Sequence, residues 1–455
     1  MNHTSKQIAV IGAGPAGLVA AKTFLESGFE VTLYETGTQV GGTWVYDNDN
    51  GRAFIYRSLH LNTAKRYTRF SDFDFAPGVA DFPDHRDMHR YLRAYADHFG
   101  ITSKIRFRSE VTSIQPCADA GGNPAAWRVQ TAAGESAEYQ AVAVCTSPFH
   151  RPRHPEQLRT AFKGQYVHAA DYREPSPFVG KRVCVIGGGN SAVDIASDVC
   201  ATAARTVMVS RSAVFIIPQA LFGRSFGELV VSYLQRWWVP GWLRRRLVKA
   251  AVRAIHGDVA RLGFKAPTHR VHPTISATIV ADIQFGRVAV KQGIAGIAGR
   301  AIRFSDRTEE EFDVIIAATG YDMRFHFVPE TVVRAHDNRI DLYKRVVVPG
   351  WPGLYFVGII NLDTPINYAC ERQSRWIASI ERGEASLPAR EAMIEDIRAK
   401  HAWVEKNYGS ALRHTVQEES TRYYAELEFE LLRARHPRWL ARWLAFLRSG
   451  PDARR

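Results

Sequence analysis

The chain of 455 residues is poor in cysteine, with five in all: Cys117, Cys145, Cys184, Cys200 and Cys370. Their number is odd and no two are spaced as Cys-x-x-Cys, so neither a disulfide framework nor a redox-active dithiol is expected. No apolar run approaches the roughly 18 residues that a membrane-spanning helix needs. A predicted strand is already reached at Ile8, which leaves no room for a signal peptide. We therefore expect a cytoplasmic protein that contacts a membrane at most at its surface.

Acidic residues are fewer than basic ones, 46 against 59, and the net charge is +13. Such an excess indicates an anionic partner, which is a nucleic acid, an acidic membrane surface or an anionic cofactor. Basic runs with interleaved aromatic residues do not occur before residue 233, so we expect no nucleic acid, and we expect no metal site. The hydrophobic share of 46% is ordinary for a globular protein, and this length allows several domains with large cores.

The first glycine-rich stretch lies near the start of the chain. Residues 7–11 predict a buried parallel strand, and Gly-Ala-Gly-Pro-Ala-Gly predicts a tight turn into a helix. Glycine lets the backbone approach a pyrophosphate at the helix N-terminus, where free N–H groups and the helix dipole attract anions. Glu35 follows the next strand, where a carboxylate accepts the ribose hydroxyls of an adenosine. We expect FAD to bind here, at Gly12, Ala13, Gly14, Pro15, Ala16, Gly17 and Glu35.

A second stretch of the same kind runs from Arg182 to Arg211. The offset that separates Gly12 from Glu35, applied to Gly187, leads to Ser210. A carboxylate there would repel a 2′-phosphate, whereas a hydroxyl and a guanidinium attract one. The alternative for Arg211 is a solvated arginine at the end of a strand. We expect NADPH to bind here, at Gly187, Gly189, Asn190, Ser191, Ala192, Ser210 and Arg211.

Two dinucleotide sites in one chain indicate hydride transfer from a nicotinamide to a flavin. A reductase that passes electrons on to a disulfide needs a dithiol beside the flavin, which this sequence lacks. A monooxygenase instead needs a dry pocket and hydrogen-bond donors that protect the oxygenated flavin.

Several motifs resemble those of one family. The segment before the second loop has the form F-x-G-x-x-x-H-x-x-x-[YF], with its fixed places at Phe162, Gly164, His168 and Tyr172. Four further motifs are Gly41–Trp44, Ser58–Lys65, Ala318–Tyr321 and Glu371–Trp376. Together they resemble the flavin-containing monooxygenase family, within the class B flavoprotein monooxygenases. Type I Baeyer–Villiger enzymes end the first motif in Trp, so Tyr172 favours the branch that oxygenates nitrogen or sulfur.

The resemblance implies roles for single residues. Asn62 is expected to be the catalytic residue, beside the isoalloxazine, where it helps to hold the C4a-hydroperoxide. A neutral amide donates and accepts hydrogen bonds without discharging the peroxide by proton transfer, although a turn asparagine is the alternative. His168 is expected either to position the linker and NADP(H) or to be a structural histidine. Further expected cofactor contacts are Gly42, Thr43, Trp44, Leu61, Asn62, Thr63, Val111 and Gln373.

The sequence departs from the family in three places. Cys145-Thr146-Ser147 stands where a glycine commonly follows the threonine, and we expect no counterpart of the long apolar anchor of eukaryotic members. Asn361–Tyr368 is polar where glycine and proline are usual. This segment is expected to border the flavin, so the substrates of familiar members do not transfer directly.

Tryptophan and arginine gather in two predicted helical segments. The segment at 232–254 contains Trp237, Trp238, Trp242 and Arg244-Arg245-Arg246. The segment at 433–448 contains Trp439, Trp443, Phe446 and Leu447 beside Arg438, Arg442 and Arg448. Such amphipathic helices suit a membrane interface. Packing on the domain, or against a second copy in a homodimer, is the alternative.

The sequence therefore predicts an α/β protein with two nested Rossmann-like dinucleotide-binding domains. Residues 1–165 and 325–455 are expected to form the FAD domain, and residues 166–324 the NADP domain with a helical insertion at about 219–283. We expect a monooxygenase in which NADPH reduces FAD, O2 forms a C4a-hydroperoxyflavin, and oxygen passes to an amine nitrogen or sulfide sulfur. The alternatives are a Baeyer–Villiger ketone oxygenase on the same scaffold and an NADPH oxidase or reductase without oxygenation.

Overall fold

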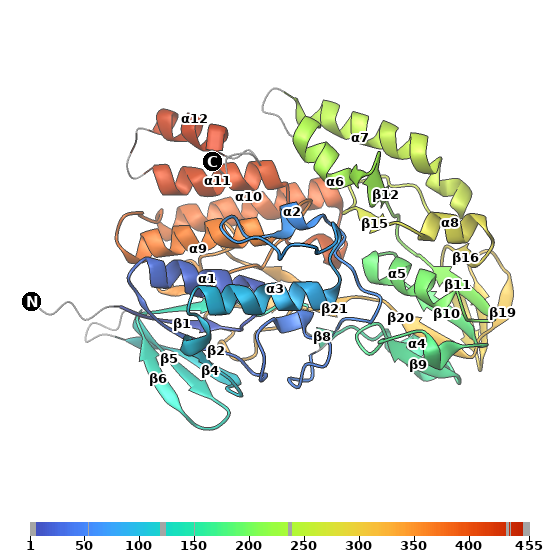
Figure 1. Ribbon diagram of the computed structural model, residues 1–455, viewed down its shortest axis with the longest axis horizontal. Coiled ribbons are helices and arrows are strands. Elements are labelled where there is room, and N and C mark those ends of the chain that lie inside the picture. Colours follow the sequence, from blue (N-terminus) through green and yellow to red (C-terminus); the bar gives the residue numbers. More distant parts are fainter. Residues whose placement is uncertain are drawn as a thin grey trace, which may run out of the picture. The chain divides into compact units, whose positions relative to one another are not determined.

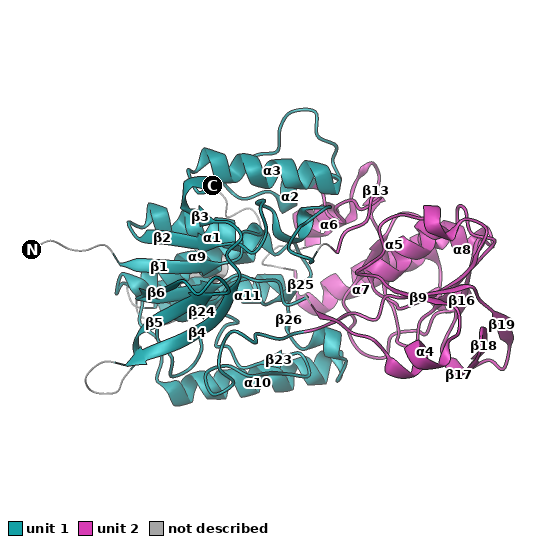
Figure 2. Ribbon diagram, turned by 90° about the horizontal axis from the view of Figure 1, so that it is seen from below, with its two compact units in different colours: residues 1–53, 65–150, 323–455 teal, residues 54–64, 151–322 magenta. Residues whose placement is uncertain are grey.

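The computed structural model describes residues 6–52, 54–118, 124–149, 151–234, 239–433, 436 and 438–448. The chain forms two compact units (Figure 2). Unit 1 consists of Met1–Ala53, Lys65–His150 and Met323–Arg455, and unit 2 consists of Phe54–Ala64 and Arg151–Asp322.

These units differ from the expected domain boundaries in three places, of which the smallest is residues 323–324, expected in the NADP domain and found in unit 1. Residues 54–64 and 151–165, which we expected in the first domain, belong to unit 2. The first segment joins unit 2 because its side chains hydrogen-bond to a helix there, as with Tyr56 and Asp194. The second joins it because Arg151–Pro152 (β8) pairs with Tyr321–Asp322 (β21) and because Gln165–His168 (β9) is an edge strand of its sheet.

Unit 1 is built on a five-stranded parallel sheet with the order β24-β7-β1-β2-β3. Its strands are β1 (Gln7–Ile11), β2 (Glu30–Tyr34), β3 (Ile105–Arg106), β7 (Ala141–Val144) and β24 (Leu354–Phe356). All four pairings are parallel, and every residue of β7 is buried, as an apolar strand covered on both faces must be. The predicted strand at residues 7–11 is therefore present as β1.

Helix α1 (Pro15–Glu26) follows β1 and packs against α9 (Asn367–Glu381) (Figure 1). Its first position is a proline, whose missing N–H costs nothing there, and Gly28 follows its end with φ of 84°. The remaining helices of the unit are α2 (Lys65–Thr68), α3 (His85–His98), α10 (Arg390–Tyr408), α11 (Ser420–Leu432) and α12 (Arg438–Arg448), with the short turns η1 (Gly42–Trp44), η2 (Thr102–Lys104) and η6 (Leu412–His414). The unit also contains an antiparallel sheet of β4 (Val111–Ala118), β5 (Pro124–Thr131) and β6 (Ser136–Tyr139). Two further strand pairs are β22 (Ala335–His336) with β23 (Arg339–Ile340), and β25 (Asn361–Leu362) with β26 (Gln417–Glu418).

Unit 2 repeats the arrangement with a parallel sheet in the order β16-β11-β10-β20-β9. Its other strands are β10 (Arg182–Ile186), β11 (Arg205–Val209), β16 (Val288–Lys291) and β20 (Val314–Ala317). Helix α5 (Asn190–Val199) connects β10 to β11, as α1 connects β1 to β2. This unit also contains an antiparallel sheet of β17 (Ile294–Ala298), β18 (Ala301–Phe304) and β19 (Glu309–Glu311). Its other elements are the helix α4 (Glu156–Ala161) and the turn η3 (Ser176–Phe178).

The insertion expected at residues 219–283 begins directly after β12 (Ile216–Pro218) and extends past β15 (Thr274–Ser276), the strand that pairs with β12. It is not wholly helical, because β13 (Ala220–Leu221) and β14 (Arg224–Ser225) form a hairpin in it. Its helical elements are α6 (Phe226–Leu229), the π-helix η4 (Val230–Leu234), α7 (Gly241–His256), η5 (Val259–Leu262) and α8 (Ile279–Gln284). Trp237 and Trp238 lie outside the described residues.

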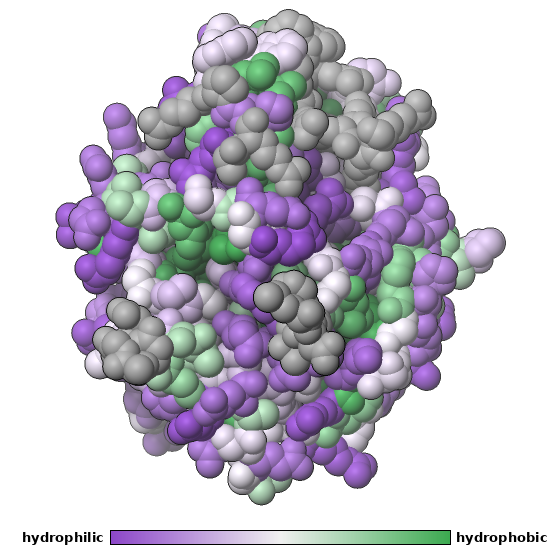
Figure 3. All heavy atoms as spheres, turned by 90° about the vertical axis from the view of Figure 1, so that its left-hand side faces the viewer, coloured by the Kyte–Doolittle hydropathy of each residue, from purple (hydrophilic) through white to green (hydrophobic). Residues whose placement is uncertain are grey.

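The face shown in Figure 3 is covered mainly by hydrophilic side chains, and its hydrophobic residues form small separate groups. Among the helices of the described residues, none combines the length and the apolar character that crossing a membrane requires.

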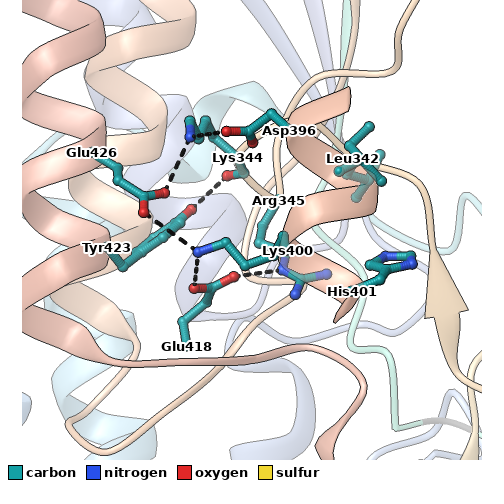
Figure 4. A pocket seen from close by; sticks show the side chains of 10 residues that line it. Leu342, Lys344, Arg345, Asp396, Lys400, His401, Glu418, Tyr423 and Glu426 are labelled. Atoms are coloured by element: carbon teal, nitrogen blue, oxygen red, sulfur yellow. Dashed lines mark hydrogen bonds and ion pairs between the residues drawn. The ribbon is translucent and has the colours of Figure 1, made fainter. Parts of the chain in front are cut away.

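A buried cluster of charges joins α10 and α11 to the loop before β24 (Figure 4). Arg345 and Lys400 donate to Glu418 at 2.9 and 2.7 Å, and Lys344 donates to Glu426 at 3.2 Å. The cluster lines a cavity of about 10 Å³, close to the smallest space that holds one water molecule. Burial alone would raise the pKa of Glu426, but the attraction of Lys400, Lys344 and Arg422 outweighs it and lowers the pKa to about 2.

We expect the substitution Glu426→Gln to lower the melting temperature near pH 7 and to have less effect near pH 3. The depressed pKa of Glu426 contributes stability above the ordinary value of 4.5, and this contribution is lost as the pH falls from there toward 2. A neutral side chain at this position costs about 3 kcal/mol near pH 7, because it removes one of the two carboxylates that each buried lysine contacts and leaves Lys344 with Asp396 alone and Lys400 with Glu418 alone. Thermal unfolding of both proteins across this pH range tests this. Glu330→Gln, at an exposed carboxylate, is the control, and a difference in melting temperature that does not change with pH would contradict the expectation.

Candidate cofactor sites

The N-terminus of α1 forms the cradle expected for FAD. Gly12, at the end of β1, has φ of 103°, and a Cβ atom at Gly17 would lie 1.8 Å from the Gly12 carbonyl oxygen. Only glycine therefore allows the helix to begin this close to the turn. Gly14 is the N-cap and no side chain caps the helix. The N–H groups of Ala16 and Gly17 precede the first intrahelical hydrogen bond, from Leu18 to Gly14, so they could donate to a pyrophosphate at the start of the helix.

Glu35 lies beside this cradle and is 5% exposed. Its two carboxylate oxygens accept hydrogen bonds from the backbone N–H groups of Ala13 and Gly37, both at 2.8 Å. A carboxylate offers about four lone-pair positions, so each oxygen can still accept a ribose hydroxyl. The bond to Ala13 fixes the carboxylate against the glycine loop. The donor set thus fits an adenine dinucleotide with free ribose hydroxyls.

The Gly41–Trp44 motif packs directly on the loop. The N–H group of Gly41 donates to the carbonyl of Ala13 at 3.0 Å, and a Cβ atom at Gly42 would lie 2.9 Å from Gly14 Cα. Thr43 and Trp44 are half-buried in η1 beside it. Val111, another expected cofactor contact in this unit, begins β4 and is 6% exposed, within the apolar core.

Gln373 is 0% exposed and acts on the cradle through Gly358. Its Oε1 atom accepts a hydrogen bond from the Gly358 N–H at 2.9 Å. Gly358 lies two residues after the end of β24 and has φ of 83°, and a Cβ atom there would lie 3.3 Å from Ala16 Cβ. Gln373 therefore fixes the backbone beside the start of α1, and its own amide is enclosed by protein.

Tyr423 completes this arrangement and was missed by the sequence analysis. Its hydroxyl accepts a hydrogen bond from Gln373 Nε2 at 2.6 Å and donates to the carbonyl of Lys344 at 2.7 Å. The residue lies on α11, which no motif marks. A tyrosine on a partly apolar helix face carries no sequence signal of a hydrogen-bonding role, so only the fold reveals it.

The polar segment Asn361–Tyr368 is tied to the same part of unit 1. Asn361 Nδ2 donates to Gln417 Oε1 at 2.8 Å, Asp363 accepts from the Ser420 N–H at 3.0 Å, and Thr364 bonds to the Tyr424 hydroxyl at 3.0 Å. These polar side chains therefore form hydrogen bonds within unit 1. Their departure from the family pattern is matched by polar partners at residues 417–424.

The N-terminus of α5 forms the cradle expected for NADPH. A Cβ atom at Gly187 would lie 2.4 Å from the Ala318 carbonyl oxygen, and one at Gly188 would lie 2.5 Å from Ser210 Oγ. A Cβ atom at Gly189, the N-cap of α5, would meet no atom within 4 Å. The helix N-terminus thus opens onto free space, where the N–H groups of Asn190 and Ser191 can bind a phosphate.

The residues after β11 differ in what they offer to a phosphate. Ser210 is 1% exposed, and its hydroxyl donates to the carbonyl of Ser212 at 2.9 Å. Arg211 is exposed and forms no ion pair within the described part of the chain. Its guanidinium is therefore the group available to a 2′-phosphate. Asn190, expected to contact the cofactor, uses Oδ1 to accept the Ile275 N–H at 2.9 Å, and Ala192 is buried.

His168 ends β9 and is 1% exposed. Burial, together with the neighbouring His154, lowers its pKa to about 4, so the ring is neutral near pH 7. Its Nδ1 atom accepts the Ala170 N–H at 3.0 Å, and its ring lies 5.5 Å from that of Tyr321. Both roles expected for this histidine, positioning the linker and NADP(H) or a structural role alone, stay predictions.

Asn62 lies in a bend of unit 2, half-buried between Leu61 and Thr63. Its side-chain amide makes no hydrogen bond within the described residues, so both its donor and its acceptor are available. The carbonyl of the preceding Leu61 accepts a hydrogen bond from Gln219 Nε2 at 3.1 Å. No group of three or more His, Cys, Asp and Glu side chains that could hold a metal occurs among the described residues.

Comparison with known proteins gives consistent matches. Flavin-containing monooxygenase 5 of Oryctolagus cuniculus is 32% identical over 435 residues, covering 90% of this chain and 80% of that protein. The N-oxide-forming dimethylaniline monooxygenase 2 of Mus musculus is 29% identical, covering 94% and 83%. Among solved structures, the S-allyl-L-cysteine S-oxygenase from Allium sativum has a TM-score of 0.71 at 25% identity, covering 98% of this chain and 92% of that one. OTEMO in complex with FAD and NADP has a TM-score of 0.66 at 18% identity, covering 93% and 97%.

These matches confirm the expected α/β fold with two Rossmann-like domains. They also confirm the expected class of enzyme, a flavin-binding monooxygenase and therefore an oxidoreductase. A family model described as flavin-binding monooxygenase-like matches residues 5–438. Since this match spans most of the sequence, the chain belongs to the flavin-binding monooxygenase-like family.

Proposed function

We propose that this flavin-dependent monooxygenase uses NADPH and O2 to oxygenate a soft nucleophile, an amine nitrogen or a sulfide sulfur. The proposal rests on a difference between the two cradles. The strand that follows the helix of the first cradle, β2, is followed by Glu35, whereas the corresponding strand of the second cradle, β11, is followed by Ser210 and Arg211. The relatives named for N-oxide formation and for S-oxygenation support the substrate class. When bound, the flavin would supply the chemistry of oxygen activation and transfer.

The protein's own groups bind FAD and NADPH, orient them and exclude water from the reaction. Glu35, fixed by Ala13 and Gly37, accepts the adenosine ribose hydroxyls of FAD, while the N–H groups at the start of α1 bind its pyrophosphate. The start of α5 and Arg211 bind NADPH. No side chain needs to act as a nucleophile, so the reaction depends on orientation and on the exclusion of water.

Asn62 is the residue that we propose to stabilise the oxygenated state of the flavin. Its amide is neutral and makes no other hydrogen bond within the described residues, which leaves a donor free for an oxygen atom. An acidic side chain there would offer a proton that releases the oxygen as H2O2.

We also propose that the protein, as a cytoplasmic enzyme, contacts an anionic membrane surface peripherally. Trp439 and Trp443 on α12 are 72% and 56% exposed, and Trp242 on α7 is 57% exposed, with Arg442 and Arg246 exposed beside them. The opposite side of α12 packs on α11 through Ala441 and Leu444. The two tryptophans therefore lie outside that packing. The side chains of Arg438, Phe446, Leu447 and Arg448 lie outside the described residues.

The first prediction that follows from the proposed function concerns the product. With NADPH and O2, the enzyme should convert a thioether to its sulfoxide or a tertiary amine to its N-oxide, with NADPH consumption matched by product. A cyclic ketone should give little lactone, and mass spectrometry of the products measures each outcome. Lactone formation in preference to sulfoxide would support a Baeyer–Villiger oxygenase. Consumption of NADPH with H2O2 as the sole product would support an oxidase.

The second prediction concerns cofactor choice. Arg211→Gln should raise the KM for NADPH by roughly 10- to 150-fold, the equivalent of about 1.5–3 kcal/mol for a charge-assisted contact, and should leave the KM for NADH nearly unchanged. Initial rates with the two nucleotides measure this. Arg205→Gln is the matched control, because Arg205 lies at the other end of β11 and pairs with Glu310. An equal change for both nucleotides would contradict a role in binding the 2′-phosphate.

The third prediction concerns the membrane. The protein should float with vesicles of anionic lipid at low salt and remain in solution with neutral vesicles or at high salt. The double substitution Trp439→Ala and Trp443→Ala should reduce flotation, whereas Phe285→Ala, at an exposed aromatic residue elsewhere, should not. A protein that stays in solution at low salt contradicts the proposal. A dimer in sedimentation that the double substitution dissociates would favour the homodimer instead.

A further inference from the structure

Two aspartates on the side of α5 hold the segment that leads to Asn62. The Tyr56 hydroxyl donates to Asp194 Oδ2 at 2.7 Å, and the Ser58 hydroxyl donates to Asp198 Oδ2 at 2.9 Å. The two aspartates are four residues apart on one helix, so their side chains lie one turn apart on the same face. Burial, stronger than the hydrogen bond from Tyr56, raises the pKa of Asp194 to about 6. An ionisable side chain is placed in such surroundings only when a partner satisfies it.

Tyr172 joins the same carboxylate. Its hydroxyl donates to Asp198 Oδ2 at 2.7 Å, so that one oxygen atom accepts from both Ser58 and Tyr172. The ring of Tyr172 is fully buried and lies 5.9 Å from that of Tyr56. The backbone N–H of Arg57 donates to the carbonyl of Arg173 at 2.8 Å. The last residue of the Phe162–Tyr172 motif thus belongs to the support of the Asn62 segment.

The other end of the segment is held next to Asn62 itself. Gln219, which follows β12, donates to the Leu61 carbonyl at 3.1 Å, and Leu59 packs against the apolar core of unit 2. Residues 54–64 are therefore bound to unit 2 at 56, 57, 58, 59 and 61. The chain returns to unit 1 at Lys65.

We propose that Asp194 and Asp198 are positioning residues that make α5 a common support for NADP(H) and for Asn62. The first turn of α5 offers its N–H groups to the nucleotide, and the next two turns hold the segment 54–64. Nucleotide binding and the position of Asn62 are thereby coupled through one helix. This inference rests on the proposed function, because it assigns a support to the residue that protects the oxygenated flavin.

The test uses the full-length holoenzyme with Tyr56→Phe, which removes one donor to Asp194 and keeps the ring. Tyr139→Phe is the matched control, since Tyr139 is a buried tyrosine of unit 1 whose hydroxyl bonds to that of Tyr34 at 2.7 Å. Two quantities are measured. One is hydrogen–deuterium exchange of the peptide that covers residues 54–64, with and without NADP+. The other is the share of consumed NADPH that appears as H2O2 with a thioether substrate.

We expect Tyr56→Phe to speed exchange of this peptide about tenfold or more, as the loss of a hydrogen bond to a charged group implies. NADP+ should slow its exchange in the wild type. The H2O2 share should rise several-fold, while the rate of flavin reduction by NADPH stays within about twofold. Tyr139→Phe should change neither the exchange of residues 54–64 nor the H2O2 share. Ser58→Ala should act in the same direction as Tyr56→Phe.

Three results would overturn the proposal, and they are distinguishable. Unchanged exchange of residues 54–64 in Tyr56→Phe would show that Asp194 does not hold the segment. Faster exchange with an unchanged H2O2 share, while Asn62→Ala raises that share, would show that Asn62 acts without this support. An unchanged H2O2 share in Asn62→Ala would remove the role of Asn62, although sulfoxide formation by the wild type would still stand for the proposed function.

Discussion

The cofactor sites of this protein depend on backbone N–H groups that the start of a helix leaves without an acceptor. In both units a parallel strand ends in glycine and the next helix begins at once, so these groups point at one place. The arrangement tolerates no side chain at Gly17, where a Cβ atom would overlap the Gly12 carbonyl, or at Gly187, where it would overlap that of Ala318. The two parallel sheets, the buried strands and the order of the chain all serve to create these two helix starts.

Given two equivalent helix starts, the chemical difference between them comes from the end of the neighbouring strand. After β2 a carboxylate is held by two backbone N–H groups, and after β11 an exposed guanidinium follows a buried serine. The carboxylate suits free ribose hydroxyls, and the guanidinium suits a phosphate. A single repeated unit can in this way be adapted to two dinucleotides of different charge.

Much of this could be predicted from the sequence, because glycine loops, apolar strands and the residues at fixed offsets from them are local patterns. Glu35, Gly17 and Gly187 are examples. Tyr423 and Asp198 could not be predicted, because their partners are far away in the chain: Gln373 is 50 positions from Tyr423, and Ser58 is 140 positions from Asp198. The membership of residues 54–64 in unit 2 was missed for the same reason, since it depends on hydrogen bonds to α5 and not on a local pattern. Gln373 was singled out as a cofactor contact, which stays a prediction, and its enclosure behind Gly358 is visible only in the fold.

The polar segment Asn361–Tyr368 has a consequence for exchanging parts between relatives. Three of its side chains are matched one to one with Gln417, Ser420 and Tyr424, about 56 to 60 positions later. The two stretches therefore form a single module that is split in the sequence. A chimaera that takes only the first stretch from a glycine- and proline-rich relative would leave the second stretch with buried polar groups and no partners. Recombination between such enzymes should preserve both stretches from one parent, and natural variation in one should be accompanied by variation in the other.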